Sequence, residues 1–176
     1  MNLSGSAVWL ARALAILGGV VLVAITILTV VSIGGRSLMG IGLRPIPGDF
    51  ELVEVGTGFA IFAFLPWCQL MRGHATVDVF TSFLPDSVNR VIDLVSEVLM
   101  TVIVVLIAWR LWYGMWDKVR YGETTFILQF PVWWGYAAAM FGAAIGVVVS
   151  FYVLYIRIRE VATGTTILGP GQGAVH

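Results

Sequence analysis

The chain consists of four long apolar segments, separated by shorter segments that hold most of its charged and turn-forming residues. Three of the apolar segments contain a long uncharged stretch, at residues 13–35, 55–71 and 124–156. The other, residues 91–112, keeps a helical apolar pattern interrupted only by three charged residues. A helix needs about 20 mainly apolar residues to cross a bilayer. The pattern therefore predicts an all-α integral membrane protein with four transmembrane helices, at about residues 12–34, 50–71, 91–112 and 131–156.

The segments between and beyond these predicted spans differ in composition. Residues 35–49 are rich in Gly and Pro and predict a loop, whereas residues 77–90, VDVFTSFLPDSVNR, are amphipathic and predict a short helix in the membrane interface. Residues 112–134 are rich in Trp and Tyr, which is typical of a headgroup boundary. We expect one transmembrane domain over residues 1–160 and a flexible tail over residues 161–176. The first apolar segment is longer than the roughly 7–15 residues of a signal-peptide core, so we expect it to be retained.

The composition supports a membrane location and argues against several other classes of protein. Hydrophobic residues make up 59% of the 176 residues and charged residues 11%, against roughly 25% charged residues in soluble domains. The mean hydropathy is +0.95, so membrane lipids are the expected surroundings. The net charge is +0 and no basic tract occurs, which predicts no nucleic-acid partner. The single cysteine, Cys68, excludes an intrachain disulfide and a cysteine-based metal site.

The basic residues do not decide which way the chain crosses the membrane. Four spans place both termini on the same side. The side of the termini holds Arg12, Arg72, Arg90, Arg157 and Arg159, and the other side holds Arg36, Arg44, Arg110, Lys118 and Arg120. Because the two sides carry equal numbers of basic residues, the positive-inside rule predicts neither orientation.

Two acidic residues, Glu51 and Glu54, lie three positions apart at the start of the second predicted span. One interpretation is a site that couples transport to a cation or a proton. The other is structural, because acids in the first turn of a helix interact favourably with its dipole and can pair with a neighbouring Arg. Their position at a span end rather than at mid-membrane favours the structural interpretation.

A second group of charges, Arg90, Asp93 and Glu97, has the three- and four-residue spacing of one helix face, and Asp86 extends this face if the helix begins early. The group is either a proton relay or a ladder of charges at a span end, and we favour the ladder. Glu97 is the deepest carboxylate of the group. If it is buried it needs a partner, because an unpaired buried charge is costly.

The histidines and small residues indicate structural roles. His74 follows the second span and the only other histidine is His176, so a haem held by two histidines within the spans is excluded. We interpret His74 as a hydrogen-bonded structural residue. In the fourth span a stripe of small residues recurs every fourth position, which allows close approach of another helix. The stripe consists of Ala138, Gly142, Gly146 and Ser150.

The chain lacks the sequence features of an enzyme or a self-contained transporter. It has no ATP-binding P-loop, no HExxH motif and no nucleophile–base pair at usable spacing, so we expect no enzymatic activity. The two halves share no visible repeat and no span is broken at mid-membrane, as secondary transporters often are.

Two blocks of the sequence resemble a known family. The first, GDFELVEVGTGFAIFAFLPWCQLMRGHATVDVFTSFLP, combines an acidic helix start, a Leu-Pro pair, a Gly-His pair, a hydrophobic-Asp pair and a second Leu-Pro pair. The second, YGETTFILQFPVWWGYAAAMFGAAIG, ends in a Gly-rich span. The order and spacing of these features resemble the DctQ-type small membrane subunit of tripartite ATP-independent periplasmic (TRAP) transporters, and the resemblance extends over residues 12–157.

The resemblance implies a role, partners and an orientation. Members of the family act with a large membrane subunit, which holds the substrate and sodium sites and moves as an elevator, and with a periplasmic binding protein that delivers an organic acid, such as a four-carbon dicarboxylate or a sialic acid. The small subunit braces the large one and itself needs no cofactor. The chain would lie in the bacterial inner membrane with both termini in the cytoplasm, and residues 36–49 and 118–129 would be periplasmic.

Under this interpretation the ionisable and small residues at span ends and helix faces serve structure or subunit contact. The candidates are Glu51, Glu54, His74, Asp78, Arg90, Asp93, Glu97, Gly142 and Gly146. Lys118 and Arg120 are candidate contacts of the binding protein. Two alternatives stay open: a small subunit of a different tripartite carboxylate transporter, and a stand-alone proton-coupled transporter with Glu97 as its coupling group.

Overall fold

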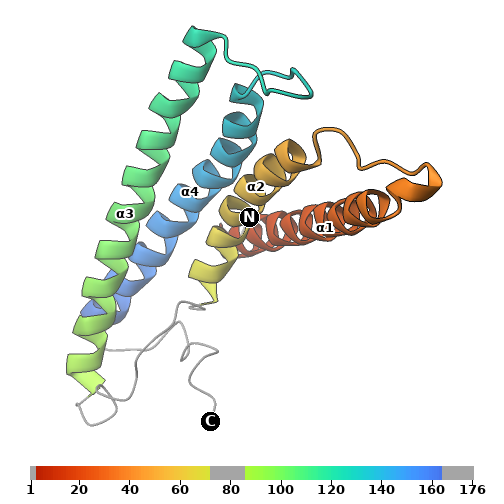
Figure 1. Cartoon of the computed structure of the whole chain (residues 1–176). Coiled ribbons are helices and arrows are strands. Elements are labelled where there is room, and N and C mark those ends of the chain that lie inside the picture. Colours follow the sequence, from red (N-terminus) through yellow and green to blue (C-terminus); the bar gives the residue numbers. More distant parts are fainter. Residues whose placement is uncertain (1–2, 72–85, 164–176) are drawn as a thin grey trace.

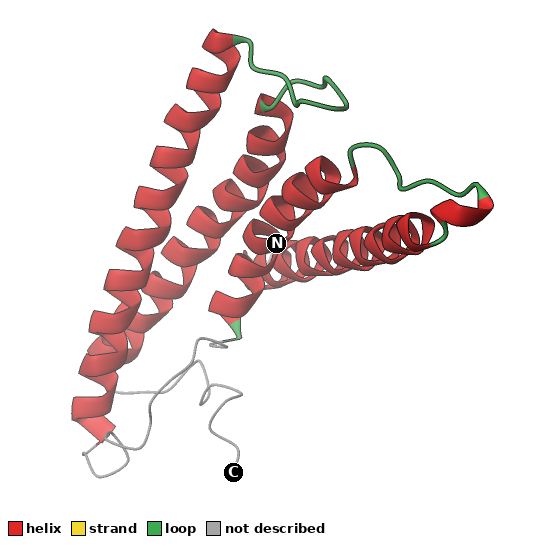
Figure 2. Ribbon diagram, in the orientation of Figure 1, coloured by secondary structure: helices red, strands yellow, loops and turns green. Residues whose placement is uncertain are grey.

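The computed structural model describes residues 3–71 and 86–163, and within these residues it contains four long helices and no strand (Figures 1 and 2). Each of the four helices is long and apolar enough to cross a membrane. The elements are α1 (Leu3–Ser37), the 3-10 helix η1 (Met39–Ile41), α2 (Asp49–Leu70), α3 (Asp86–Tyr121) and α4 (Trp133–Thr163). The prediction of an all-α membrane protein with four spanning helices is confirmed.

Helices α1, α3 and α4 are longer than the spans predicted from hydropathy, whereas α2 matches its predicted span to within one residue at each end. Helix α1 begins at Leu3, before Arg12, and α3 extends beyond residues 91–112 at both ends. Charged residues are costly in hydrocarbon but are compatible with a helix, so apolar content marks the membrane section and not the whole helix. Of the predicted interfacial helix, residues 86–90 form the first turns of α3, and residues 77–85 lie outside the described part. Most of the predicted tail also lies outside it.

The helices pack in the order α1, α2, α4 and α3, so that α2 and α4 are the inner pair. Within the described residues, the backbones of α2 and α3 make no close contact. The beginning of α1 meets the ends of α2 and α4 in an apolar cluster of Ala11, Leu70, Val149 and Val153. The first and last described helices therefore have their outer ends on the same side of the molecule, as an even number of spans requires.

Glycines allow α1 and α4 to approach α2 closely. A Cβ atom at Gly18 would lie 2.9 Å from Ala63 Cβ, and one at Gly142 would lie 2.9 Å from the backbone of Phe62. Both glycines are buried, in α1 and α4 respectively, and both face α2. The small-residue stripe of the fourth span is thus a packing surface, and it packs against α2 of the same chain.

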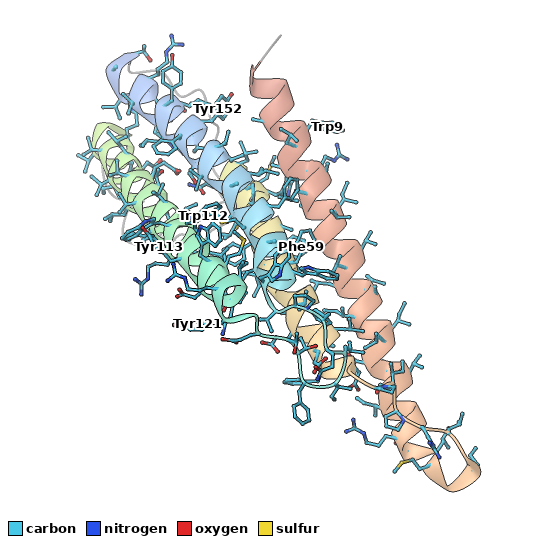
Figure 3. The ribbon with its side chains drawn as sticks, turned by 90° about the horizontal axis from the view of Figure 1, so that it is seen from above. Trp9, Phe59, Trp112, Tyr113, Tyr121 and Tyr152 are labelled. Carbon is cyan, nitrogen blue, oxygen red and sulfur yellow. The ribbon has the colours of Figure 1, made fainter. Side chains whose placement is uncertain are left out.

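Large apolar side chains cover the outer surfaces, and Figure 3 shows them projecting from α1 and α3. On α1, Val20, Val23 and Ile27 are each about 60% exposed (60%, 61% and 59%). Such surfaces would be unfavourable in water but suit lipid tails or a second membrane protein. The fold therefore has a narrow buried core and two broad apolar outer faces.

Candidate functional site

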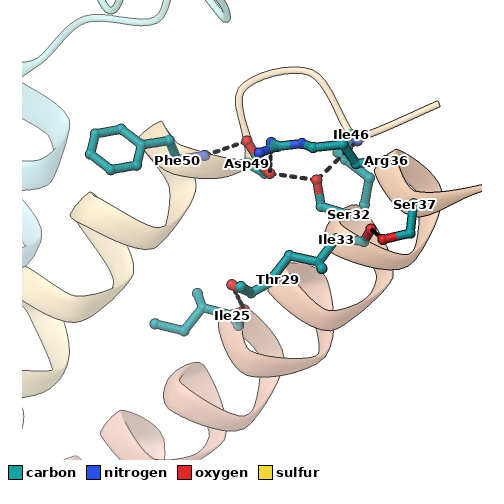
Figure 4. Close-up of polar contacts among 9 residues, drawn as sticks. All are labelled: Ile25, Thr29, Ser32, Ile33, Arg36, Ser37, Ile46, Asp49 and Phe50. Carbon is teal, nitrogen blue, oxygen red and sulfur yellow. Dashed lines mark hydrogen bonds and ion pairs between the residues drawn. The ribbon is translucent and has the colours of Figure 1, made fainter. Parts of the chain in front are cut away.

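Polar side chains join the helices at both ends of the bundle, and these contacts form the candidate site. Ser32, at the end of α1, donates a short hydrogen bond to Asp49 Oδ2 at the start of α2 (Figure 4). The same hydroxyl accepts the backbone N–H of Ile46 at 3.2 Å. Arg36 lies 3.9 Å from Asp49 Oδ2. The loop between α1 and α2 is therefore closed by side chains from both of its ends.

Glu51 holds the α3–α4 connection against the start of α2. Glu51 is only 8% exposed. Its two carboxylate oxygens accept hydrogen bonds from the backbone N–H groups of Ile127 at 2.6 Å and Leu128 at 2.9 Å. Gly48 packs against the Leu128 side chain at a positive φ of 74°, so a larger residue there would be unfavourable for two reasons. These two charge-assisted hydrogen bonds stabilise the buried carboxylate and give two N–H groups of the loop an acceptor.

Glu54 differs from Glu51, although the two lie on neighbouring positions of the same helix. Glu54 is exposed and makes no hydrogen bond or ion pair with the described residues. The structure therefore separates the two acids: Glu51 acts within the chain, whereas Glu54 faces outward at the level of the first turns of α2.

At the opposite end of α2, Gln69 connects three helices. Its side-chain N–H donates to Glu97 Oε1 on α3 at 2.7 Å, and its carbonyl oxygen lies 2.7 Å from the hydroxyl of Ser150 on α4. Gln69 and Ser150 are 2% and 0% exposed. The Ser150 hydroxyl also lies 2.8 Å from the carbonyl oxygen of Gly146, so its single proton is shared between two acceptors. Glu97, the deepest carboxylate predicted from the sequence, is half-buried and has Gln69 as its hydrogen-bond partner.

A buried ion cluster lies closer to the beginning of α3 and the end of α4, one to two turns from the Gln69 network. Arg157 Nη1 is 2.5 Å from Glu160 Oε2 and 3.6 Å from Asp93 Oδ2. Arg157 and Glu160 are 4% and 1% exposed. Because a buried charge is stable only when it is paired, this cluster fixes the end of α4 against the beginning of α3. Arg90 is half-buried in α3, close to this end.

The two candidate contacts of a binding protein have different environments. Lys118 donates to Glu123 Oε2 at 2.6 Å and so closes the start of the α3–α4 connection. Arg120 is exposed, and with Tyr113, Trp116 and Asp117 it lines an open hollow of about 470 Å³ on α3.

Several of these contacts were not predicted from the sequence, and two predicted residues are not described. Gln69, Ser150, Glu160, Ser32 and Asp49 were missed as partners, although the expectation that Glu97 needs one would have favoured a polar residue such as Gln69. His74 and Asp78 lie outside the described residues. Within the described part, no group of three or more His, Cys, Asp or Glu side chains is arranged to hold a metal ion.

Comparison with known proteins gives one family match. The family described as "Tripartite ATP-independent periplasmic transporters, DctQ component" matches residues 25–160. The matched part includes the last third of α1, all of α2 and α3 and nearly all of α4. Every polar contact described above therefore lies within the matched residues. No curated protein matches the chain.

Proposed function

Because the chain belongs to the DctQ component family of tripartite ATP-independent periplasmic transporters, we propose that it is the small membrane subunit that braces the large permease subunit. The family forms part of a transporter that also has a large permease and a binding protein. In this proposal the chain is static, the large subunit moves as an elevator, and transport is coupled to sodium.

The observation that supports the bracing role is how the buried polar groups are used. The described residues bury seven polar or charged side chains: Ser32, Glu51, Gln69, Thr101, Ser150, Arg157 and Glu160. All except Thr101 bind another side chain or a loop backbone. Five of these six contacts join two different helices, or a helix and a loop. The sixth residue, Glu160, pairs with Arg157 in its own helix. Groups committed to such contacts hold the fold together and are not free to bind a substrate.

An organic acid would need a cation, and the one buried cation among the described residues, Arg157, is already neutralised. Arg157 is paired with Glu160 and lies close to Asp93. We therefore place the substrate and sodium sites of the proposed complex in the large subunit, and we assign no cofactor to this chain. The transported compound would be an organic acid such as a dicarboxylate or a sialic acid.

The proposal includes an orientation. The chain lies in the bacterial inner membrane with both termini in the cytoplasm, so the α1–α2 and α3–α4 connections face the periplasm. Arg120 would then be the better candidate contact of the binding protein, because Lys118 is already bound to Glu123. Unchanged affinity of the binding protein after Arg120→Glu would exclude this contact.

The bracing role is tested by separating assembly from substrate selection. We would co-express a tagged chain with the large subunit and measure the recovery of the large subunit and the preference of the complex among a panel of organic acids. Gln69→Leu is expected to lower recovery, whereas any complex that is recovered keeps the wild-type preference. Arg159→Gln, at an exposed position, is the matched control. A changed preference in an intact complex, or no recovery with the wild-type chain, would refute the proposal.

A further inference from the structure

Arg110 lies well inside α3 and faces away from the rest of the chain. Its side chain is exposed, and it forms no hydrogen bond or ion pair with any described residue. The buried positions of α3, Thr101, Val104 and Ala108, lie on the other side of the helix, against α4. Arg110 is therefore on the outer face of an outer helix.

The packing of α3 against α4 gives the depth of Arg110 in the membrane. Val104 packs near Gly146 and Gly114 packs against Tyr136, so Arg110 lies between these two levels. Glu97 and Lys118 mark the two polar ends of the spanning part of α3, and at 1.5 Å per residue they are about 32 Å apart, close to the roughly 30 Å of hydrocarbon in a bilayer. On the same scale Arg110 is about 12 Å from Lys118 and about 20 Å from Glu97. Measured from these two ends, Arg110 lies within the hydrocarbon region. The predicted span of residues 91–112 instead placed Arg110 at the membrane boundary, and the longer helix α3 moves this boundary outward.

Arg110 belongs to a continuous row of exposed side chains. The row, which we call the α3 seam, repeats at alternating intervals of four and three residues and consists of Leu99, Ile103, Leu106, Arg110, Tyr113 and Asp117. This is the spacing of a surface that packs along a second helix. The open hollow lined by Tyr113, Trp116, Asp117 and Arg120 adjoins one end of the seam.

We propose that the α3 seam docks a transmembrane helix of the large permease subunit, and that this helix places a carboxylate opposite Arg110. The inference rests on the proposed function. An unpaired arginine in hydrocarbon is costly, whereas an arginine paired with a carboxylate at a protein interface is stable and specifies the register of the two helices.

Two other occupants fit the seam less well. In a two-fold dimer of this chain with its axis along the membrane normal, equivalent residues lie at equal depth, so Arg110 would face the Arg110 of the second copy. Lipid suits the outer face of α1, where Val20, Val23 and Ile27 are apolar and no charge occurs between Arg12 and Arg36. The α3 seam differs from that face by its central cation.

The first test maps the neighbour of the seam while Arg110 is kept. Cys68 is the only cysteine, so Cys68→Ala gives a background in which single cysteines can be labelled with a photoreactive maleimide. We expect Leu106→Cys to cross-link to a helix of the large subunit, within about two turns of a carboxylate, in membranes that contain the complex. Ile27→Cys on α1 is the control and is expected to label lipid.

Each other outcome refutes the inference. If Leu106→Cys labels only lipid, or labels a second copy of the chain, no helix of the large subunit docks on the seam. The proposed function would still stand in that case, provided that the wild-type chain recovers the large subunit. Failure of the wild-type chain to recover the large subunit would refute the proposed function and this inference together.

A second test uses the charge itself. Arg110→Gln is expected to lower the recovery of the large subunit roughly tenfold, the effect of one well-formed ion pair. Arg159→Gln, at an exposed position of α4 away from the seam, is expected to leave recovery within about twofold. A charge exchange is expected to restore recovery: Arg110→Glu in this chain, combined with an arginine in place of the large-subunit carboxylate found near the cross-link. Equal recovery with Arg110→Gln and wild type would refute the carboxylate partner.

Discussion

Gln69 and Glu97 join two helices whose backbones do not touch. The Gln69 side chain in α2 donates to Glu97 Oε1 in α3 at 2.7 Å, and α4 fills the space between the helices with Ser150, whose hydroxyl contacts the same glutamine. One amide side chain therefore holds three helices in register at the end of the bundle where α2 ends. Because hydrocarbon offers no competing hydrogen-bond partners, the loss of one member leaves the others unsatisfied.

This network predicts the effect of removing the glutamine. Gln69→Leu is expected to destabilise the purified chain by about 1–3 kcal/mol, because Glu97 and Ser150 lose a buried partner. The double substitution Gln69→Leu with Glu97→Leu is expected to recover part of this loss, since it removes the half-buried carboxylate that the single substitution leaves without the glutamine amide. Thermal unfolding in detergent measures both effects. A single variant as stable as wild type would show that the network does not support the fold.

The contrast between two neighbouring acids gives a second prediction. Glu51→Gln removes one of the two oxygens that accept the N–H groups of Ile127 and Leu128, so the amide hydrogens of the α3–α4 connection are expected to exchange about tenfold faster. Glu54→Gln is the matched control and is expected to leave exchange in this loop unchanged. Hydrogen–deuterium exchange followed by mass spectrometry makes the comparison, and equal exchange in the two variants would contradict the assignment of Glu51.

The packing of α4 on α2 predicts opposite effects of one substitution at two glycines. Gly142→Ala places a methyl group 2.9 Å from the backbone of Phe62 and is expected to destabilise the chain by about 1–3 kcal/mol. Gly58→Ala meets no neighbouring atom within 4 Å and is expected to be neutral or to stabilise α2 by up to about 1 kcal/mol. Thermal unfolding of the two variants measures the change in stability that each substitution causes. A shift of the same sign and size in both would argue against close packing at Gly142.

The ion cluster predicts a difference between two adjacent arginines. Arg157→Leu removes the buried guanidinium that pairs with Glu160 and is expected to cost about 3–5 kcal/mol. Arg159→Leu, at an exposed position two residues later, is expected to cost less than about 1 kcal/mol. The yield of monodisperse protein and its unfolding temperature measure the difference. Similar behaviour of the two variants would mean that the Arg157 cluster contributes little.

The sequence was sufficient for the number and approximate position of the spanning helices, but not for their ends or contacts. Apolar residues mark the part of each helix that lies in hydrocarbon, whereas α3 continues through charged residues at both ends. Glu51 and Glu54 share a helix face in the sequence pattern. Only the fold of the loop at residues 127–128 separates them, because that loop supplies the donors for Glu51 and leaves Glu54 exposed.

The uncharged polar residues were the least visible in the sequence. Gln69 and Ser150 lie inside apolar runs and, being neutral, do not interrupt the hydropathy pattern as a charge does. Their importance comes from meeting Glu97, which is a property of three helices together. The need of Glu97 for a partner was predictable, and the identity of that partner required the packing of α2 and α4.

The bracing role is tested most directly by reconstitution. We would place the chain alone, the large subunit alone, and both together in liposomes, add the binding protein loaded with the ligand that it carries when purified, and measure sodium-driven uptake of that ligand. The proposed role predicts uptake only when both membrane subunits are present. Uptake by the chain alone would contradict it and would make Glu97 a candidate coupling group instead of a structural one.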